Sequence, residues 1–120
     1  MSSIFIVDDS RTMRKILAGS LTEAGYEVIG NACNGEDALA QLENLNPDLI
    51  TLDITMPEMD GLEALKRIIE KNPDQKVVML SAAGQKDKVM QALKIGAIDF
   101  IQKPYEPETA IETINKILNS

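Results

Sequence analysis

Acidic side chains stand where two apolar runs of the chain end. Ile4–Val7 is followed by Asp8 and Asp9, and Leu49–Leu52 is followed by Asp53. Short apolar runs that stop at turn-forming residues are typical of central strands in a parallel sheet, which helices cover on both faces. The carboxyl ends of such strands meet at one edge of the sheet, where open α/β folds bind their ligands. We therefore expect these carboxylates to share one crevice.

Two further polar groups follow predicted strands in the same way. Val77–Leu80 is followed by Ser81, and Asp99–Gln102 is followed by Lys103. Clustered carboxylates raise one another's pKa unless a cation compensates them. Mg²⁺ (or Mn²⁺) fits such a crevice, because Mg²⁺ binds one or two carboxylates together with water and phosphate oxygens. Asp53 would then serve as a nucleophile toward phosphorus, while the metal ion, Lys103 and Ser81 balance the charge of the phosphoryl group.

Helical periodicity fills the intervals between these strands. Apolar residues recur at spacings of three and four, which predicts amphipathic helices, in Arg11–Gly25, Asn34–Asn46, Gly61–Asn72, Val89–Gly96 and Ala110–Leu118. The side chains predicted to face inward include Ile16, Met90 and Leu93. The more polar stretch Glu27–Ala32 is typical of an edge strand.

Alternating strands and helices of this length predict an α/β fold. Repeated strand–helix units form a parallel sheet with right-handed crossovers and helices on both faces. Three strands are predicted to be fully buried and two to be more exposed, as expected for a five-stranded open sheet with two edges. We predict a doubly wound, flavodoxin-like sheet with strand order 2-1-3-4-5 and its switch point between the first and third strands. Residues 1–120 are expected to form a single domain without an output domain.

Composition excludes several classes of protein. The net charge of −7 argues against a nucleic-acid partner, because binding to phosphate backbones needs clustered Lys and Arg. The chain has no histidine, which rules out His-dependent triads and His-ligated metal sites. The N-terminal apolar run is too short for a signal peptide or a membrane span. The single cysteine, Cys33, cannot form an internal disulfide, which fits a cytoplasmic protein.

The motifs together resemble the receiver domain of two-component response regulators, and in particular a stand-alone, chemotaxis-type member. The resemblance extends from Ile4 to Leu118. It is carried by Val7-Asp8-Asp9-Ser10, by Asp53 with Met56-Pro57 and Asp60-Gly61, by Ser81-Ala82, and by Phe100 with Lys103-Pro104. A phosphorylation-driven signalling switch is the function that this resemblance implies.

The resemblance also implies a role for each acidic residue. Asp53 would be the phosphoacceptor, and Asp9 would bind the metal ion directly. Asp8 would hold the metal ion through water, and the backbone carbonyl of Thr55 would be a further ligand.

A conformational switch follows from the same resemblance. Ser81 and Lys103 would contact the phosphoryl group, and the Lys103–Pro104 peptide bond would be cis. The Ser81 hydroxyl would move toward the phosphoryl group, and the ring of Phe100 would follow into the vacated space. Because Phe100 has no hydroxyl, its movement would rely on packing alone.

The implied partners are proteins. A chemotaxis-type histidine kinase would donate the phosphoryl group and would meet Met13, Arg14 and Leu17. A downstream target such as the flagellar motor switch would bind a face made by the fourth helix, the fifth strand and the fifth helix, and a phosphatase is a further possible partner. The polar residues expected on that face are Lys88, Gln91, Lys94, Gln102, Tyr105 and Glu106. We expect a monomer that is not an enzyme, catalysing only its own phosphorylation and dephosphorylation.

Three other functions are weighed against this hypothesis. One is a phosphorelay intermediate that passes its phosphoryl group to a histidine phosphotransfer protein. Another is an aspartyl-phosphate phosphohydrolase, but such enzymes usually carry a second acid two residues after the nucleophile, where this chain has Thr55. The third is a flavin-binding electron carrier, which would need a Ser/Thr/Gly-rich phosphate loop where Asp8 and Asp9 stand.

Overall fold

A five-stranded parallel sheet forms the centre of the structure, a computed structural model that describes residues 1–119. The strand order is β2-β1-β3-β4-β5, which confirms the predicted doubly wound, flavodoxin-like arrangement. The strands are β1 Ser3–Val7, β2 Glu27–Ala32, β3 Leu49–Asp53, β4 Lys76–Ser81 and β5 Asp99–Gln102.

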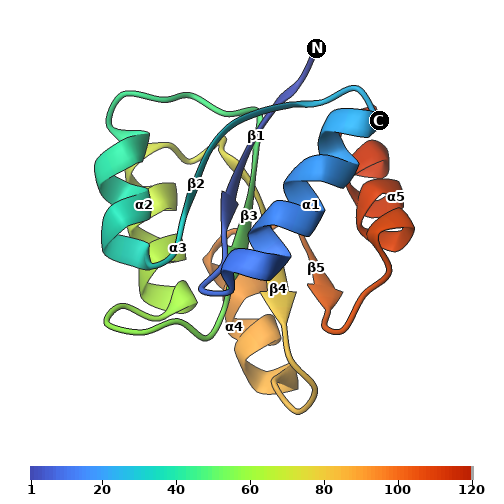
Figure 1. Cartoon of the computed structure of the whole chain (residues 1–120). Coiled ribbons are helices and arrows are strands. Elements are labelled where there is room, and N and C mark those ends of the chain that lie inside the picture. Colours follow the sequence, from blue (N-terminus) through green and yellow to red (C-terminus); the bar gives the residue numbers. More distant parts are fainter. Residues whose placement is uncertain (120) are drawn as a thin grey trace.

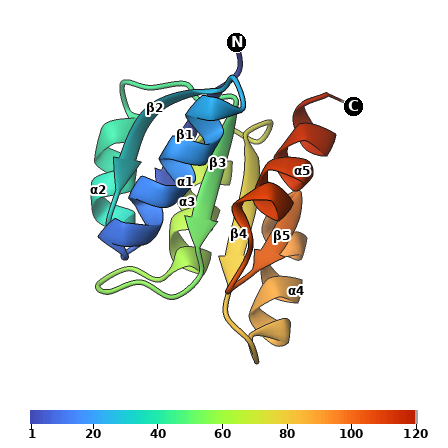
Figure 2. The same cartoon turned by 45° about the vertical axis from the view of Figure 1, so that its right-hand side comes forward.

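Helices cover both faces of this sheet, as Figures 1 and 2 show. Helices α1 and α5 lie on one face, and α2, α3 and α4 lie on the other. The helices are α1 Arg11–Glu23, α2 Gly35–Leu42, α3 Gly61–Lys71, α4 Lys86–Ile95 and α5 Pro107–Leu118. No helix in residues 1–119 combines the length and the hydropathy that crossing a membrane requires.

Alternation along the strands divides the core into two layers. In β1, Ile4 and Ile6 pack with the buried residues of α1 and α5. Phe5 and Val7 pack with those of α2, α3 and α4. Successive side chains of a strand point to opposite faces, so a strand that is covered on both faces is expected to be apolar at most positions. The central strands are accordingly mostly apolar, with Thr51 of β3 as a buried polar residue.

Side chains cap the first three helices. Ser10 accepts a hydrogen bond from the Met13 N–H at the start of α1. Asn34 and Asp60 cap α2 and α3 in the same way. Such caps satisfy backbone donors that have no partner within the helix. Helix α4 differs, because the side chain of Gln85 at its N-cap position makes no capping hydrogen bond.

Three side chains predicted to face inward are in fact exposed. Ile16 is 46% exposed, Met90 52% and Leu93 37%. Ile16 directly precedes the buried Leu17 of α1, and Met90 and Leu93 directly follow the buried Val89 and Ala92 of α4. Neighbouring residues differ by roughly 100° around a helix, so a helix resting on a sheet buries only the narrower stripe. The predicted stripes were too wide.

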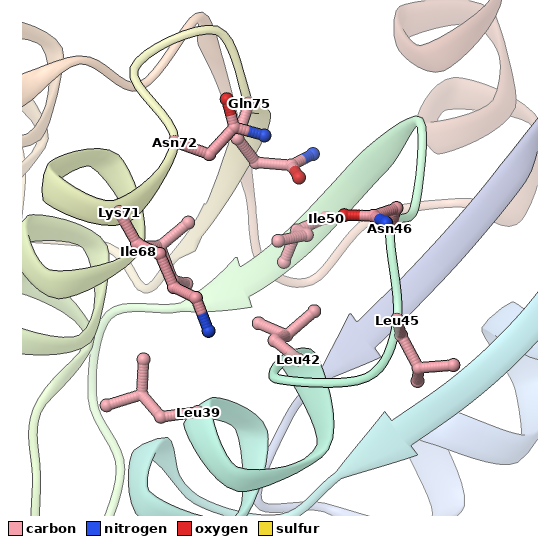
Figure 3. Close-up of a pocket in the computed structure, with 9 residues that line it drawn as sticks. All are labelled: Leu39, Leu42, Leu45, Asn46, Ile50, Ile68, Lys71, Asn72 and Gln75. Atoms are coloured by element: carbon pink, nitrogen blue, oxygen red, sulfur yellow. The ribbon is translucent and has the colours of Figure 1, made fainter.

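A cavity of about 260 Å³ opens between α2 and α3. Figure 3 shows Leu39 and Leu42 from α2 facing Ile68 of α3, with Ile50 of β3 beneath them and Lys71 alongside. We call this feature the α2–α3 cavity. It also includes residues of the loops that precede β3 and β4, so it lies away from the carboxyl ends of the strands.

Candidate functional site

Strand register brings the acidic residues together. In the β1–β3 pair, Val7 lies opposite Leu52, so the residue after each, Asp8 and Asp53, reaches the same level at the carboxyl edge. One carboxylate oxygen each of Asp8, Asp9 and Asp53 lies within 4.8 Å of the others. Asp53 is the last residue of β3, whereas Asp8 and Asp9 follow β1. We call these three residues the acidic triad.

Lys103 reaches the triad from the end of β5. Its ammonium nitrogen lies 3.0 Å from Asp8 Oδ2 and 2.9 Å from Asp53 Oδ2. The Lys103 backbone N–H donates a 2.6 Å hydrogen bond to the Ser81 carbonyl, which ties the β5 end to the β4 end. The Lys103–Pro104 peptide bond is cis. One cation thus bridges two carboxylates that come from different strands.

The carboxylates of this bridge are removed from water. Asp8 is 1% exposed and Asp53 is 5% exposed, while Asp9 is exposed. Burial raises the pKa of Asp53 to about 6, against the opposing effect of Lys103, and the charges of Asp8 and Asp9 raise it further. Burial lowers the pKa of Lys103, but its hydrogen bonds to Asp53 and Asp8 outweigh this effect and raise the pKa overall. Because three carboxylates face one ammonium group, the site carries an excess of negative charge.

The loop after β3 is fixed close to Asp53. The Gly61 N–H donates a 2.7 Å hydrogen bond to the Ile54 carbonyl. A Cβ atom at Gly61 would lie 2.1 Å from the Asp53 carbonyl oxygen, closer than any real side chain could lie. Only glycine fits there, which explains why Asp60, the cap of α3, is followed by Gly61.

The Asp8 loop is held by α1. Asp8 Oδ1 accepts a hydrogen bond from the Ser10 N–H at 2.9 Å, and Arg14 donates to the Asp8 carbonyl at 2.6 Å and to Asn31 at 3.1 Å. Arg14 therefore holds the backbone of the Asp8 loop in place. Leu17, one of the residues predicted to meet a phosphodonor, is only 2% exposed. That prediction is wrong for Leu17, because its side chain belongs to the buried stripe of α1.

Ser81 and Phe100 line one cavity. Ser81 ends β4 and is 2% exposed, whereas Phe100 in β5 is 42% exposed. A cavity of about 370 Å³ extends between them and is also lined by Ala82, Gln85 and Val89. The aromatic ring therefore has space beside it on the Ser81 side.

Thr55 is part of the same crevice. Its backbone N–H lies 3.4 Å from Asp53 Oδ1, and its hydroxyl accepts a hydrogen bond from the Gln85 side chain. The role of Gln85 could not be foreseen, since nothing in the sequence pattern points from the start of a helix back to a strand end.

The donor set fits a hard divalent cation. Three carboxylates converge at the crevice, and Lys103 is the one cation that pairs with any of them in residues 1–119. Oxygen ligands and an unbalanced negative charge are what Mg²⁺ prefers. The residues that could hold the ion are therefore the acidic triad, with the backbone carbonyl of Thr55 close by in sequence.

The predicted partner face is largely accessible. Five of its six polar residues are exposed: Lys88, Gln91, Lys94, Gln102 and Glu106. Tyr105 differs, because its hydroxyl is buried without a hydrogen-bond partner in the described chain. Burial raises the pKa of Tyr105 to about 12, with a contribution from the nearby Asp8 charge. The exposed Phe100 and Met90 make α4 and β5 more apolar than the sequence analysis predicted.

Comparisons with known proteins agree with this geometry. The model of the response regulator receiver domain matches residues 4–115. The chain is 46% identical over 114 residues to the chemotaxis protein CheY of Thermotoga maritima, covering 95% of each chain. It is 45% identical over 116 residues to CheY of Bacillus subtilis, covering 97% of each chain.

A solved structure shows the same fold. A chain of the CheX–CheY–BeF3–Mg²⁺ complex from Borrelia burgdorferi matches with a TM-score of 0.93 and 36% identity. The match covers 98% of this chain and 89% of that chain. Lys103 forms ion pairs with both Asp8 and Asp53 at the ends of two strands. Together with this geometry, the similarities identify the chain as a CheY-like member of the receiver-domain family of response regulators.

Proposed function

We propose that this protein is a response regulator of chemotaxis, phosphorylated on Asp53 in the presence of Mg²⁺. The observation that carries the proposal is the position of Lys103, which lies within 3.0 Å of both Asp8 and Asp53. One ammonium does not balance three converging carboxylates, so the crevice favours a divalent ion and, beside it, a phosphoryl group. A cytoplasmic signalling role without enzymatic turnover is consistent with this site.

Phosphorylation would use Asp53 as the nucleophile. A carboxylate oxygen of Asp53 attacks phosphorus, a new O–P bond forms, and the bond from phosphorus to the donor breaks. The donor leaves with the bonding electrons, as acetate from acetyl phosphate or as a histidine side chain from a phosphorylated kinase. Lys103 and the Ser81 hydroxyl orient the phosphoryl oxygens. Mg²⁺ bound by Asp8, Asp9, Asp53 and the Thr55 carbonyl would supply charge neutralisation.

The cavity between Ser81 and Phe100 supports a mechanical link to the surface. When Ser81 turns toward a phosphoryl group, the ring of Phe100 has about 370 Å³ of adjoining space to enter. Inward movement would remove apolar surface from water, and burial of apolar area is favourable. The accessible face of α4, β5 and α5 would change shape, which is how a target such as the flagellar motor switch would sense the state of Asp53.

Phosphotransfer to this chain tests the proposal. A chemotaxis histidine kinase labelled with radioactive phosphate is mixed with the protein, and label on the protein is followed with and without Mg²⁺. The expected result is rapid, Mg²⁺-dependent labelling of the wild type. Binding to the motor-switch protein is then expected to increase after labelling. Labelling without any change in binding would instead favour a phosphorelay role, which is tested by adding a histidine phosphotransfer protein.

A further inference from the structure

One side chain joins the two loops that flank Asp53. The Oε1 atom of Gln85 accepts a 2.6 Å hydrogen bond from the Ala82 N–H. The Nε2 atom of the same carboxamide donates to the hydroxyl of Thr55. Thr55 follows Asp53 by two residues, and Ala82 follows Ser81 directly. A single amide group therefore bridges the β3–α3 loop and the β4–α4 loop.

The local backbone places Gln85 for this contact. Gln85 stands at the N-cap position of α4, where Ser, Thr, Asp or Asn ordinarily caps the helix. Its side chain makes no such cap. The preceding Gly84 has φ +84, a conformation that glycine adopts without strain. The chain thus turns so that the Gln85 carboxamide faces the crevice instead of its own helix.

The hydrogen bond at Ala82 matters for phosphorylation. Asp53 pairs with Leu80 across the β3–β4 ladder, so the Ser81–Ala82 peptide lies directly beyond the partner of Asp53. Backbone N–H groups placed where negative charge develops stabilise phosphoryl oxygens. In the structure the Ala82 N–H already has an acceptor, Gln85 Oε1. A phosphoryl oxygen at Asp53 and the Gln85 side chain would compete for the same donor.

We propose that Gln85 is a positioning residue that latches the two loops in the unphosphorylated state and competes with the phosphoryl group for the Ala82 N–H. This inference rests on the proposed phosphorylation of Asp53. The latch must open as the O–P bond forms, so it slows phosphoryl uptake. When the latch is open, the N-terminus of α4 is no longer hydrogen-bonded to Thr55 through Gln85. Phosphorylation is thereby coupled to α4 by a route that does not involve Ser81 or Phe100.

Substitution of Gln85 by methionine isolates the latch. Methionine keeps an unbranched side chain of similar length but removes both hydrogen bonds. A typical hydrogen bond contributes about 0.5–1.5 kcal/mol net, and each 1.36 kcal/mol is tenfold in rate. We therefore expect Gln85→Met to take up phosphoryl from acetyl phosphate about threefold to tenfold faster than the wild type. Gln85→Glu keeps the acceptor and adds a negative charge, so it should take up phosphoryl more slowly.

Two measurements on the full chain test this inference. The first is the time course of the phosphorylated mass in intact-protein mass spectrometry with acetyl phosphate and Mg²⁺, a reaction that releases acetate. The second is hydrogen exchange of the Ala82 amide by NMR without phosphodonor, which should be faster in Gln85→Met than in the wild type. Asn44→Ala, which alters an exposed amide of the loop after α2, is the matched control and should change neither quantity.

The outcomes separate the latch from the proposed function. Faster uptake together with faster Ala82 exchange in Gln85→Met supports the latch. Uptake by Gln85→Met at or below the wild-type rate overturns it, even if the wild type is phosphorylated normally. If the wild type gains no phosphoryl group, the proposed function fails and the latch loses its role in phosphorylation with it. A third variant, Thr55→Val, should reduce the effect of Gln85→Met, because one end of the bridge is then already absent.

Discussion

The α2–α3 cavity and the acidic triad are two concave regions on opposite ends of the sheet. The cavity is lined largely by apolar side chains such as Leu39, Leu42 and Ile68. No ion pair joins the residues shown in Figure 3. The triad holds three carboxylates and pairs them with Lys103 alone. Burial of apolar area stabilises the first region, whereas burial of charge destabilises the second.

The difference in buried charge between the two regions indicates which of them could carry out a reaction. The α2–α3 cavity is the more apolar of the two regions, and the residues that line it include no carboxylate. Burial of the triad's charges lowers the folding stability. The same burial raises the pKa of Asp53, and the site keeps an unbalanced negative charge. Removal of a buried apolar side chain from the cavity should therefore lower the free energy of unfolding, whereas removal of the Asp53 carboxylate should raise it, and only the second change should affect phosphorylation.

The largest expected effect on stability lies in the cavity. Ile68→Ala removes a 5% exposed side chain of α3, and we expect it to lower the free energy of unfolding by about 3 kcal/mol, as large-to-small core substitutions do. Urea unfolding measures the change. Phosphoryl uptake under conditions where the variant is folded should equal that of the wild type. A loss below about 1 kcal/mol would contradict the packing role assigned to Ile68.

Removing the cation at the triad comes next. Lys103→Met leaves Asp8 and Asp53 without their ammonium partner, and we expect it to lower the free energy of unfolding by about 2 kcal/mol at pH 7 without metal. This value is discounted because the Lys103 side chain is 23% exposed. Addition of Mg²⁺ should restore part of the loss.

Lys71→Met at the α2–α3 cavity is the matched control for Lys103→Met. Lys71 is exposed and makes no ion pair in the part of the chain that is described, so its substitution should change stability by less than about 0.5 kcal/mol. Equal losses of unfolding free energy in Lys71→Met and Lys103→Met would contradict the proposed difference between the two regions.

The smallest effect expected from a substitution at the triad and its Lys103 partner is a gain in stability. Asp53→Asn removes a carboxylate whose pKa is raised to about 6 from 3.8, so we expect it to raise the free energy of unfolding at pH 7 by about 1 kcal/mol in the absence of metal. A gain in stability at the proposed phosphoacceptor would sharpen the comparison with Ile68. Thermal or urea unfolding in the presence of a chelator provides the measurement.

The same pKa sets a pH dependence with a definite sign. Because the folded pKa of Asp53 exceeds its unfolded value, the folded state binds the proton more tightly. The stabilisation that comes from protonated Asp53 is therefore fully present below about pH 4 and is lost as pH rises through about 6. The difference in stability between Asp53→Asn and the wild type should follow this window. A difference that stays constant from pH 4 to pH 7 would contradict the raised pKa.

Much of the fold follows from local sequence patterns. The short, largely apolar runs at Ile4–Val7 and Leu49–Leu52 predict strands covered on both faces, and the pairing of these strands places Asp8 beside Asp53. The strands and helices are predictable because each depends on a periodicity or on a turn signal within a few residues. The strand order 2-1-3-4-5 does not follow from these local patterns; it was predicted from the flavodoxin-like arrangement of doubly wound sheets.

The features that escaped prediction depend on long-range geometry. The exposure of Met90 and Ile16 is decided by how each helix rests on the sheet, which a periodic pattern does not record. The burial of the Tyr105 hydroxyl depends on how the segment after β5 packs against the rest of the fold. The Gln85 bridge joins residues 30 positions apart, and a glutamine at the start of a helix carries no signal for such a contact.

The central claim is that the acidic triad accepts one phosphoryl group on Asp53 with the help of a divalent ion. Intact-protein mass spectrometry after incubation with acetyl phosphate tests it most directly, with Mg²⁺ or with a chelator, for the wild type and Asp53→Asn. We predict one labile phosphoryl adduct on the wild type with Mg²⁺, and none with chelator or on Asp53→Asn. Absence of an adduct under every condition, or an adduct on Asp53→Asn equal to that on the wild type, would contradict this account.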